Sequence, residues 1–164
     1  MKAAVTILCF FAFATLVHAA SEPILAASLK WSGHFGGSAT EPHTAYCLMG
    51  RGFFQMPTSD DLPKLIEAWI HDHPKAVVVP IASIQPYLDK VRESKLTYVW
   101  IVDGEFNLNI ELVRQGCFAP ETQAVPIGKK PSVGQKRYEA FVDRLIEAAQ
   151  YANDHKLGIW KNSK

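Results

Sequence analysis

The pattern of hydrophobic and polar positions predicts an amphipathic helix over residues 60–71. Apolar side chains recur there at helical spacing and form one face: Leu62, Leu65, Ile66, Trp69 and Ile70. The segment Thr58-Ser59-Asp60-Asp61 offers an N-cap, and Asp60 and Asp61 would be favourable in the first turn because of the helix dipole. Pro74 closes this segment.

A second, longer helix is predicted near the C-terminus. Ser132 and Gln135 have the spacing of a capping box. Apolar residues then keep helical spacing from Tyr138 to Ala152. Gly158 is expected to end this helix, because glycine readily adopts the left-handed conformation found at helix C-termini.

Two apolar runs between these helices predict strands. Residues 76–81 are rich in β-branched side chains, and Pro80 places that strand at a sheet edge or a bulge. Residues 96–102 are apolar on both faces, which predicts a central strand. Residues 83–94 fit either a short helix or a loop, and residues 45–54 are compatible with one further strand.

A short helix is predicted directly after the central strand. Asp103-Gly104 forms a turn, and Asn107 then caps a helix that runs to Gln115. Gly116 provides its C-terminal stop.

The composition indicates one folded domain. The chain has 164 residues, of which 48% are apolar and 20% are charged, so intrinsic disorder and collagen-like repeats are excluded. The formal net charge is only +1, which argues against a non-specific nucleic-acid binder but leaves room for a local basic patch.

The N-terminus has the three-part pattern of a secretory signal peptide over residues 1–20. A positive start precedes the uncharged run of residues 3–17, and small residues follow. Cleavage is expected after Ala19 or Ala20, which leaves residues 21–164 as a single secreted or periplasmic domain; an uncleaved anchor is the alternative. No later apolar stretch is long enough to span a membrane.

Two cysteines remain after this segment, Cys47 and Cys117. In an oxidising compartment an even number of cysteines suggests a disulfide between them. Two buried free thiols are the alternative.

The second half of the chain resembles the staphylococcal nuclease (thermonuclease) family. The similarity lies in three stretches, residues 96–104, 108–116 and 138–160, the last of which ends in Lys-Leu-Gly-Ile-Trp. The residues that match the family's structural motifs are Asp103, Gly104, Asn109, Arg114, Gly116 and Trp160. The resemblance implies an α+β fold, an OB-type β-barrel with three helices, in which the N-terminal strands are partial or rebuilt. It also implies that Arg114 binds carbonyls or a carboxylate and holds the C-terminal helix.

The family's catalytic motifs are absent. Its members cleave phosphodiester bonds with calcium, using Asp-Gly-Asp-Thr, Arg-Leu-x-x-Val-Asp-Thr-Pro-Glu and Tyr-Gly-Arg segments, none of which occurs here. Lys95 stands where the family has the arginine of its Tyr-Gly-Arg segment. A lysine keeps the positive charge but lacks the planar, forked guanidinium. Lys95 is the one position at which the resemblance to the family points to phosphate chemistry, and a solvated lysine before a strand is the alternative.

Metal-binding candidates can be found in two places. His71 and His73, with His34 or His43, could ligate a metal, and Asp60 and Asp61 could bind calcium. Favourable helix-end charges explain the same residues without a metal.

Nucleic-acid candidates are similarly scattered. Arg51, Lys129, Lys130, Lys136 and Arg137 could form a basic surface, and Trp31, Phe53 and Phe54 could stack on bases. Solvated charges and an aromatic core are the alternatives.

Two classes of function follow from these observations. The first is a binding or interaction module on a nuclease-like fold that has lost the family active site, with protein or nucleic acid as partner. The second is a metal-dependent nuclease, with calcium as cofactor if the family chemistry is retained, whose carboxylates are rebuilt from Glu41, Asp60, Asp61 or Glu105. The absent motifs favour the first.

Overall fold

A mixed sheet and three α-helices make up the fold in this computed structural model, which describes residues 22–52, 54, 58–85, 94–119 and 131–162. The sheet strands are β1 (Lys30–Ser32), β2 (Phe35–Gly37), β3 (Thr44–Leu48), β4 (Val77–Ile84), β5 (Lys95–Asp103) and β6 (Phe106–Asn107). The helices are α1 (Leu62–Asp72), α2 (Leu108–Arg114) and α3 (Gln135–Asp154), with short 3-10 turns η1 (Ala26–Ser28) and η2 (Gly158–Trp160). The predicted signal peptide lies outside the described residues.

The predicted central strand is confirmed. β5 lies between β3, to which it is parallel, and β4, to which it is antiparallel, and β6 pairs with its end. Its residues from Tyr98 to Ile101 are almost fully buried, as expected for a strand that is covered on both faces. β4 is the last strand in the sheet order and its register shifts after Pro80, so both the edge and the bulge are confirmed.

The two ends of the sheet are connected through the N-terminal segment. β1 and β2 form a hairpin at one end, and β4 lies at the other. The segment before β1 pairs with β4 through the Leu25–Val77 bridge, in which Val78 N–H donates to Ile24 O (2.8 Å). Within the described residues, β1 and β4 form no ladder with each other, so the α+β sheet agrees with the prediction and a closed barrel is not seen.

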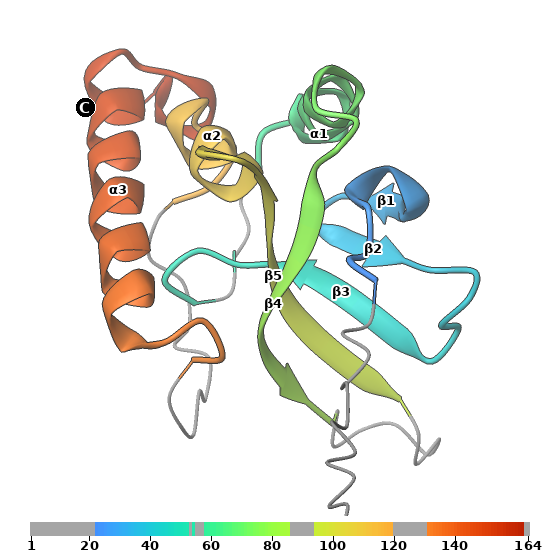
Figure 1. Cartoon of the computed structure of the whole chain (residues 1–164). Helices are drawn as coiled ribbons and strands as arrows, with labels where there is room; N and C mark the ends of the chain where they lie inside the picture. Colours follow the sequence, from blue (N-terminus) through green and yellow to red (C-terminus); the bar gives the residue numbers. More distant parts are fainter. Residues whose placement is uncertain (1–21, 53, 55–57, 86–93, 120–130, 163–164) are drawn as a thin grey trace, which may run out of the picture.

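The helices cover one part of this sheet. Figure 1 shows α2 and α3 packed side by side at the left, with α1 to the right of α2 and β1–β3 on the side of the molecule away from α3. A single cluster of buried residues reaches from the N-terminal hairpin to α3. No helix in the described ranges has the length and apolar character needed to cross a membrane.

The helix ends differ from the sequence prediction in three respects. α1 begins later than expected, with Asp61 as an N-cap whose side chain makes no capping bond, and its first turn carries no acid. The capping box of α3 is wrong, because Gly134 is the N-cap and Ser132 Oγ donates to Ile81 O on β4 (3.0 Å). α3 ends at Asp154, before Gly158, and Gly158 starts η2.

The predicted disulfide is also wrong. Cys47 and Cys117 are free thiols, and both are fully buried. Cys47 lies on β3 opposite Tyr98 of β5, whereas Cys117 follows α2. Burial raises the pKa of each thiol to about 12, so both stay protonated and unreactive at neutral pH.

These thiols make the first testable prediction. In the native protein, iodoacetamide should leave Cys47 and Cys117 unmodified at pH 8, because neither thiol is exposed or ionised. After unfolding in guanidinium without reductant, peptide mapping should find both alkylated. A linked pair of peptides carrying these two cysteines would contradict the structure.

Candidate functional site

The residues proposed for a rebuilt nuclease site lie on separate elements. Lys95 is exposed at the start of β5, and no described carboxylate lies within 4.0 Å of its side chain. Glu41 accepts a hydrogen bond from Tyr46 Oη (2.7 Å), and burial beside Glu41 raises the pKa of Tyr46. Asp60 and Asp61 precede α1, and Glu105 lies in the turn between β5 and β6. The described residues therefore do not assemble these acids around Lys95.

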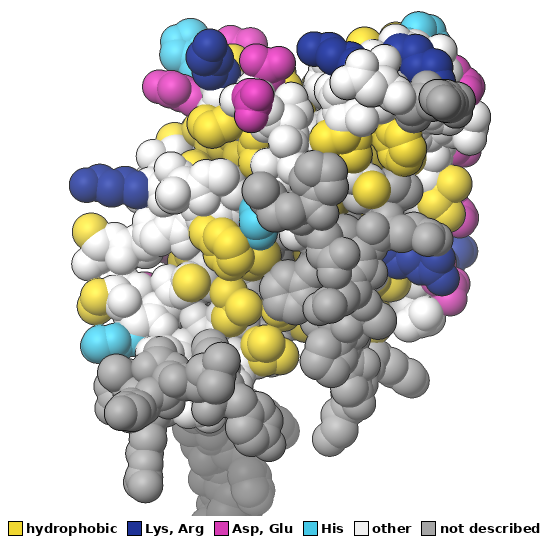
Figure 2. Space-filling model, turned by 180° about the vertical axis from the view of Figure 1, so that it is seen from behind, with side chains coloured by type: hydrophobic (Ala, Val, Ile, Leu, Met, Phe, Trp, Pro, Cys, Tyr) yellow, Lys and Arg dark blue, Asp and Glu magenta, His cyan; other side chains and the backbone are white. Residues whose placement is uncertain are grey.

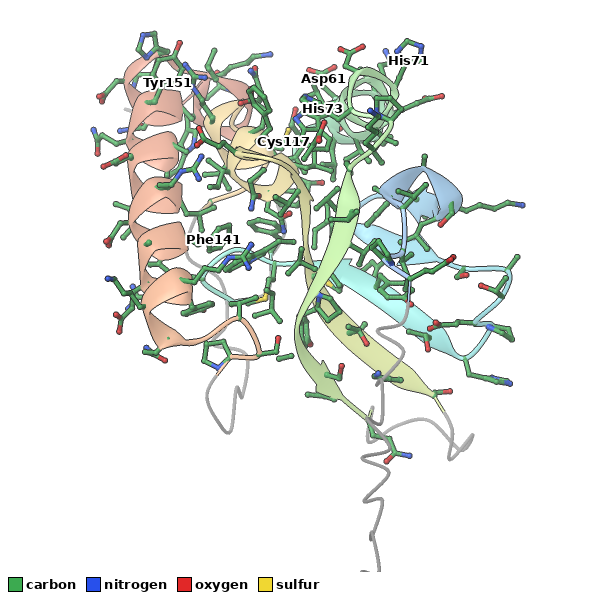
Figure 3. The ribbon with its side chains drawn as sticks, viewed as in Figure 1. Asp61, His71, His73, Cys117, Phe141 and Tyr151 are labelled. Atoms are coloured by element: carbon green, nitrogen blue, oxygen red, sulfur yellow. The ribbon has the colours of Figure 1, made fainter. Side chains whose placement is uncertain are left out.

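His71, in the last turn of α1, and His73, which follows the helix as its C-cap, point in different directions. His71 is exposed, and its Nδ1 lies 3.1 Å from Oδ1 of the neighbouring Asp72. His73 lies on the side of α1 that faces α2 (Figure 3), with its Nδ1 3.0 Å from Asp103 Oδ2. Its ring stacks on Trp69 and contacts Phe106. No three histidine, cysteine or acidic side chains of the described chain gather as a metal site.

The family-motif residue Asn109 is a buried structural link. It is fully buried on α2, and its Oδ1 accepts the N–H of Ile101 on β5 (3.0 Å). Its Nδ2 donates to Val99 O (2.9 Å) and to Met49 O, beyond the end of β3 (2.8 Å). One side chain thus joins α2 to the two parallel strands at the centre of the sheet. Asp103, another residue of the motif, makes the contact with His73 that is described above.

Gly116 and Gly158 fasten the chain after α3 to the end of α2. Ile159 N–H donates to Gly116 O (2.9 Å), and both glycines have positive φ, 71° and 49°. A Cβ at either position would overlap the backbone of the other segment. Trp160 follows directly in η2, where its backbone N–H donates to Leu157 O (2.9 Å).

Arg114 contacts α3 through an aromatic ring. Its guanidinium lies 4.6 Å from the centre of the Tyr151 ring, and Nη1 is 3.9 Å from Glu111 Oε2. Arg114 therefore does contact a carboxylate and the C-terminal helix, although the link to the helix is a cation–π contact.

Among the candidates that the structure describes, Phe54 and Trp31 have packing roles. Phe54 is buried and stacks on Phe118 at 4.2 Å, as in an aromatic core. Trp31 is half-buried, and its Nε1 donates to Ala26 O (3.2 Å). Arg51 lies in the loop after β3 and Lys136 on α3, whereas Phe53, Lys129 and Lys130 lie outside the described residues. On the face opposite to Figure 1, charged side chains lie over α1 and along α3, and hydrophobic ones gather below α1 and between the two helices (Figure 2).

A groove runs along α3, and sequence reasoning missed it. Two adjoining hollows of about 420 and 480 Å³ share Glu105, Asn107 and Arg144, and together we call them the α3 groove. The first hollow is lined by Trp69, Phe106, Arg114 and Tyr151, and the second by Trp100, Arg137 and Phe141. Figure 3 shows Tyr151 near the C-terminal end of α3, and Phe141 farther towards its N-terminal end.

Exposed aromatic and arginine side chains distinguish this groove. Phe106 is 63% exposed and Tyr151 38%, so both belong to the small group of large hydrophobic residues that are exposed in the described part of the chain. With the residues that the structure describes, Arg144 makes a single long hydrogen bond, from Nη2 to Glu105 O (3.4 Å). The spacing of Arg137, Arg144 and Tyr151, seven residues each, was the one available sequence signal, because it places them on one face of α3.

Comparison with known proteins identifies no family. No protein-family model and no curated protein sequence matches the chain. One similar solved structure is the "Extended Tudor domain of Drosophila Melanogaster Tudor-SN (p100)", with 18% sequence identity and a TM-score of 0.44. The match covers 71% of this chain and 47% of that chain, which is less than half of its length. A likeness at this level carries no information on activity or partner.

Proposed function

We propose that this protein is a binding module, with a nuclease-like scaffold, that holds a segment of a partner protein in the α3 groove. The observation that carries the proposal is the exposure of Phe106 and Tyr151 beside Arg114 and Arg144 in one hollow. Aromatic residues and arginine are enriched where proteins bind one another, because they offer large contact areas together with directed hydrogen bonds.

The shape of the groove favours an elongated partner. Arg137 and Tyr151 lie at its two ends, fourteen residues apart on one helix face. That separation corresponds to about 21 Å along the helix axis, or about six residues of extended chain. A compact small molecule would fill only one of the two hollows.

The charges in the groove favour a polypeptide over a nucleic acid. Glu105, Glu111 and Glu147 line the same hollow as Arg114 and Arg144. A phosphate backbone would be repelled by these carboxylates, whereas a polypeptide can place either charge opposite them. With the predicted signal peptide, the proposed partner would lie in the periplasm or outside the cell.

The second prediction tests this proposal with a random heptapeptide library displayed on phage. Peptides enriched on the purified full chain should bind the Phe106→Ser variant about tenfold more weakly, because that substitution removes an aromatic anchor. The matched control is Ile146→Ser, since Ile146 is an exposed hydrophobic residue of α3 that does not line the groove. Fluorescence anisotropy measures the dissociation constants of the synthetic peptides.

Two results would argue against the proposal. One is that no peptide is enriched beyond an unrelated control protein. The other is that enriched peptides bind Phe106→Ser and the wild-type protein equally well, which would place their site elsewhere. Circular dichroism of each variant checks that the fold is retained.

A further inference from the structure

Two arginines in the α3 groove form no ion pair with any carboxylate that the structure describes. Among the described residues, no acid lies within ion-pair distance of Arg137 or Arg144. Arg114, in the same groove, does approach Glu111. A guanidinium presents five N–H donors in a planar fork. Among the described residues, the donors of these two arginines make one hydrogen bond, the long one from Arg144 to Glu105 O. Their donors are therefore available to a ligand.

A buried tryptophan lines the hollow between them. Trp100 of β5 lines this hollow and is 2% exposed. Its ring stacks on Phe141 at 4.2 Å, and the Arg137 guanidinium lies 5.9 Å from its centre. The buried indole Nε1–H has no hydrogen-bond partner in the described part of the chain.

We infer that the hollow between Arg137 and Arg144 is a subsite for a carboxylate side chain of the bound segment. This inference rests on the proposed peptide-binding function and adds the chemistry of the ligand. A carboxylate accepts two parallel hydrogen bonds from a guanidinium, and such charge-assisted bonds are about twice as strong as neutral ones. The neighbouring hollow, lined by Trp69, Phe106 and Tyr151, accepts an apolar or aromatic side chain of the same segment.

The spacing of the two hollows sets the expected sequence of the segment. They meet at Arg144 and Glu105, so the acidic and the apolar residue of the ligand lie close together in its sequence. Residues two apart in an extended chain are about 7 Å apart and point to the same side, which suits two adjoining hollows. The expected ligand pattern is an Asp or Glu within about two to four residues of a large apolar side chain.

The third prediction tests this subsite by charge reversal. Peptides enriched on the wild-type chain should share an acidic residue, and Arg144→Glu should weaken their binding about tenfold or more. The matched control is Lys136→Glu, which makes the same charge change on α3 at a residue that does not line the groove. Changing the acidic residue of the peptide to arginine should restore binding to Arg144→Glu and weaken binding to the wild type.

The outcomes separate the two proposals. Peptides that depend on Phe106 but carry no acidic residue, or that bind Arg144→Glu normally, would overturn the carboxylate subsite and leave the binding module intact. The absence of any enriched peptide would overturn both. If single-stranded DNA displaces the peptides at equimolar concentration and fails to bind Arg144→Glu, the arginines contact phosphate, and the choice of a polypeptide ligand is wrong.

Discussion

Replacing Gly158 with alanine is expected to lower the free energy of unfolding by about 3 kcal/mol or more. Two costs add at this position. Gly158 has φ 49°, where a Cβ is unfavourable by about 1–2 kcal/mol. The added Cβ would also lie 2.5 Å from the carbonyl carbon of Gly116, far inside a normal carbon contact of about 3.5–4.0 Å. Because both sides of this contact are backbone, a side-chain rotation cannot relieve it.

A matched glycine separates the two costs. Gly33 has φ 57°, and a Cβ there would meet nothing within 4 Å. Gly33→Ala should therefore cost about 1 kcal/mol, the conformational part alone. Urea unfolding followed by circular dichroism gives both free energies. If Gly158→Ala and Gly33→Ala destabilise equally, the backbone contact between Gly116 and Gly158 does not exist as described.

Local patterns were sufficient to predict β5 and α2, although not the short strand β6 between them. The apolar run of residues 96–102 reports burial on both faces directly, and the Asn107 side chain caps α2 as expected, accepting Ile110 N–H at 3.2 Å. Only one part of the role of Gly116 could be predicted from the sequence. Its position after a helix predicts the positive φ, but its contact with Gly158 depends on where α3 returns the chain.

Tertiary contacts decided the features that were predicted wrongly. Ser132 has the spacing of a capping box, yet its hydroxyl donates a hydrogen bond to the carbonyl of Ile81 on β4 instead of capping α3. An even number of cysteines does not say how far apart the thiols lie in the fold. Here Cys47 is on β3 and Cys117 follows α2, and both are free. The α3 groove draws Trp69 from α1, Phe106 from β6 and Tyr151 from α3. No spacing along the chain connects three such separate segments.

Asn109→Leu is expected to lower the free energy of unfolding by about 3 kcal/mol or more. Leucine is close to asparagine in size, so the loss is chemical: Ile101 N–H and the carbonyls of Val99 and Met49 would remain buried without their partner. Each unsatisfied polar group costs about 1–3 kcal/mol. Urea unfolding of the variant and of the wild type measures this loss, and a difference below about 1 kcal/mol would contradict the described link.

Asn109→Asp tests the same link through its dependence on pH. The new carboxyl keeps an acceptor for Ile101 N–H but turns the second oxygen towards the carbonyls of Val99 and Met49. Burial and these two acceptors disfavour the ionised form, so the pKa of the carboxyl in the folded state should exceed its unfolded value of about 3.9. The folded state then binds more protons than the unfolded state, and stability falls as the pH rises above about 4. Relative to wild type at each pH, the variant should lose more stability at pH 7 than at pH 4. Equal losses at both pH values would mean that the carboxyl reaches solvent, and that Asn109 does not lie between α2 and the two parallel strands.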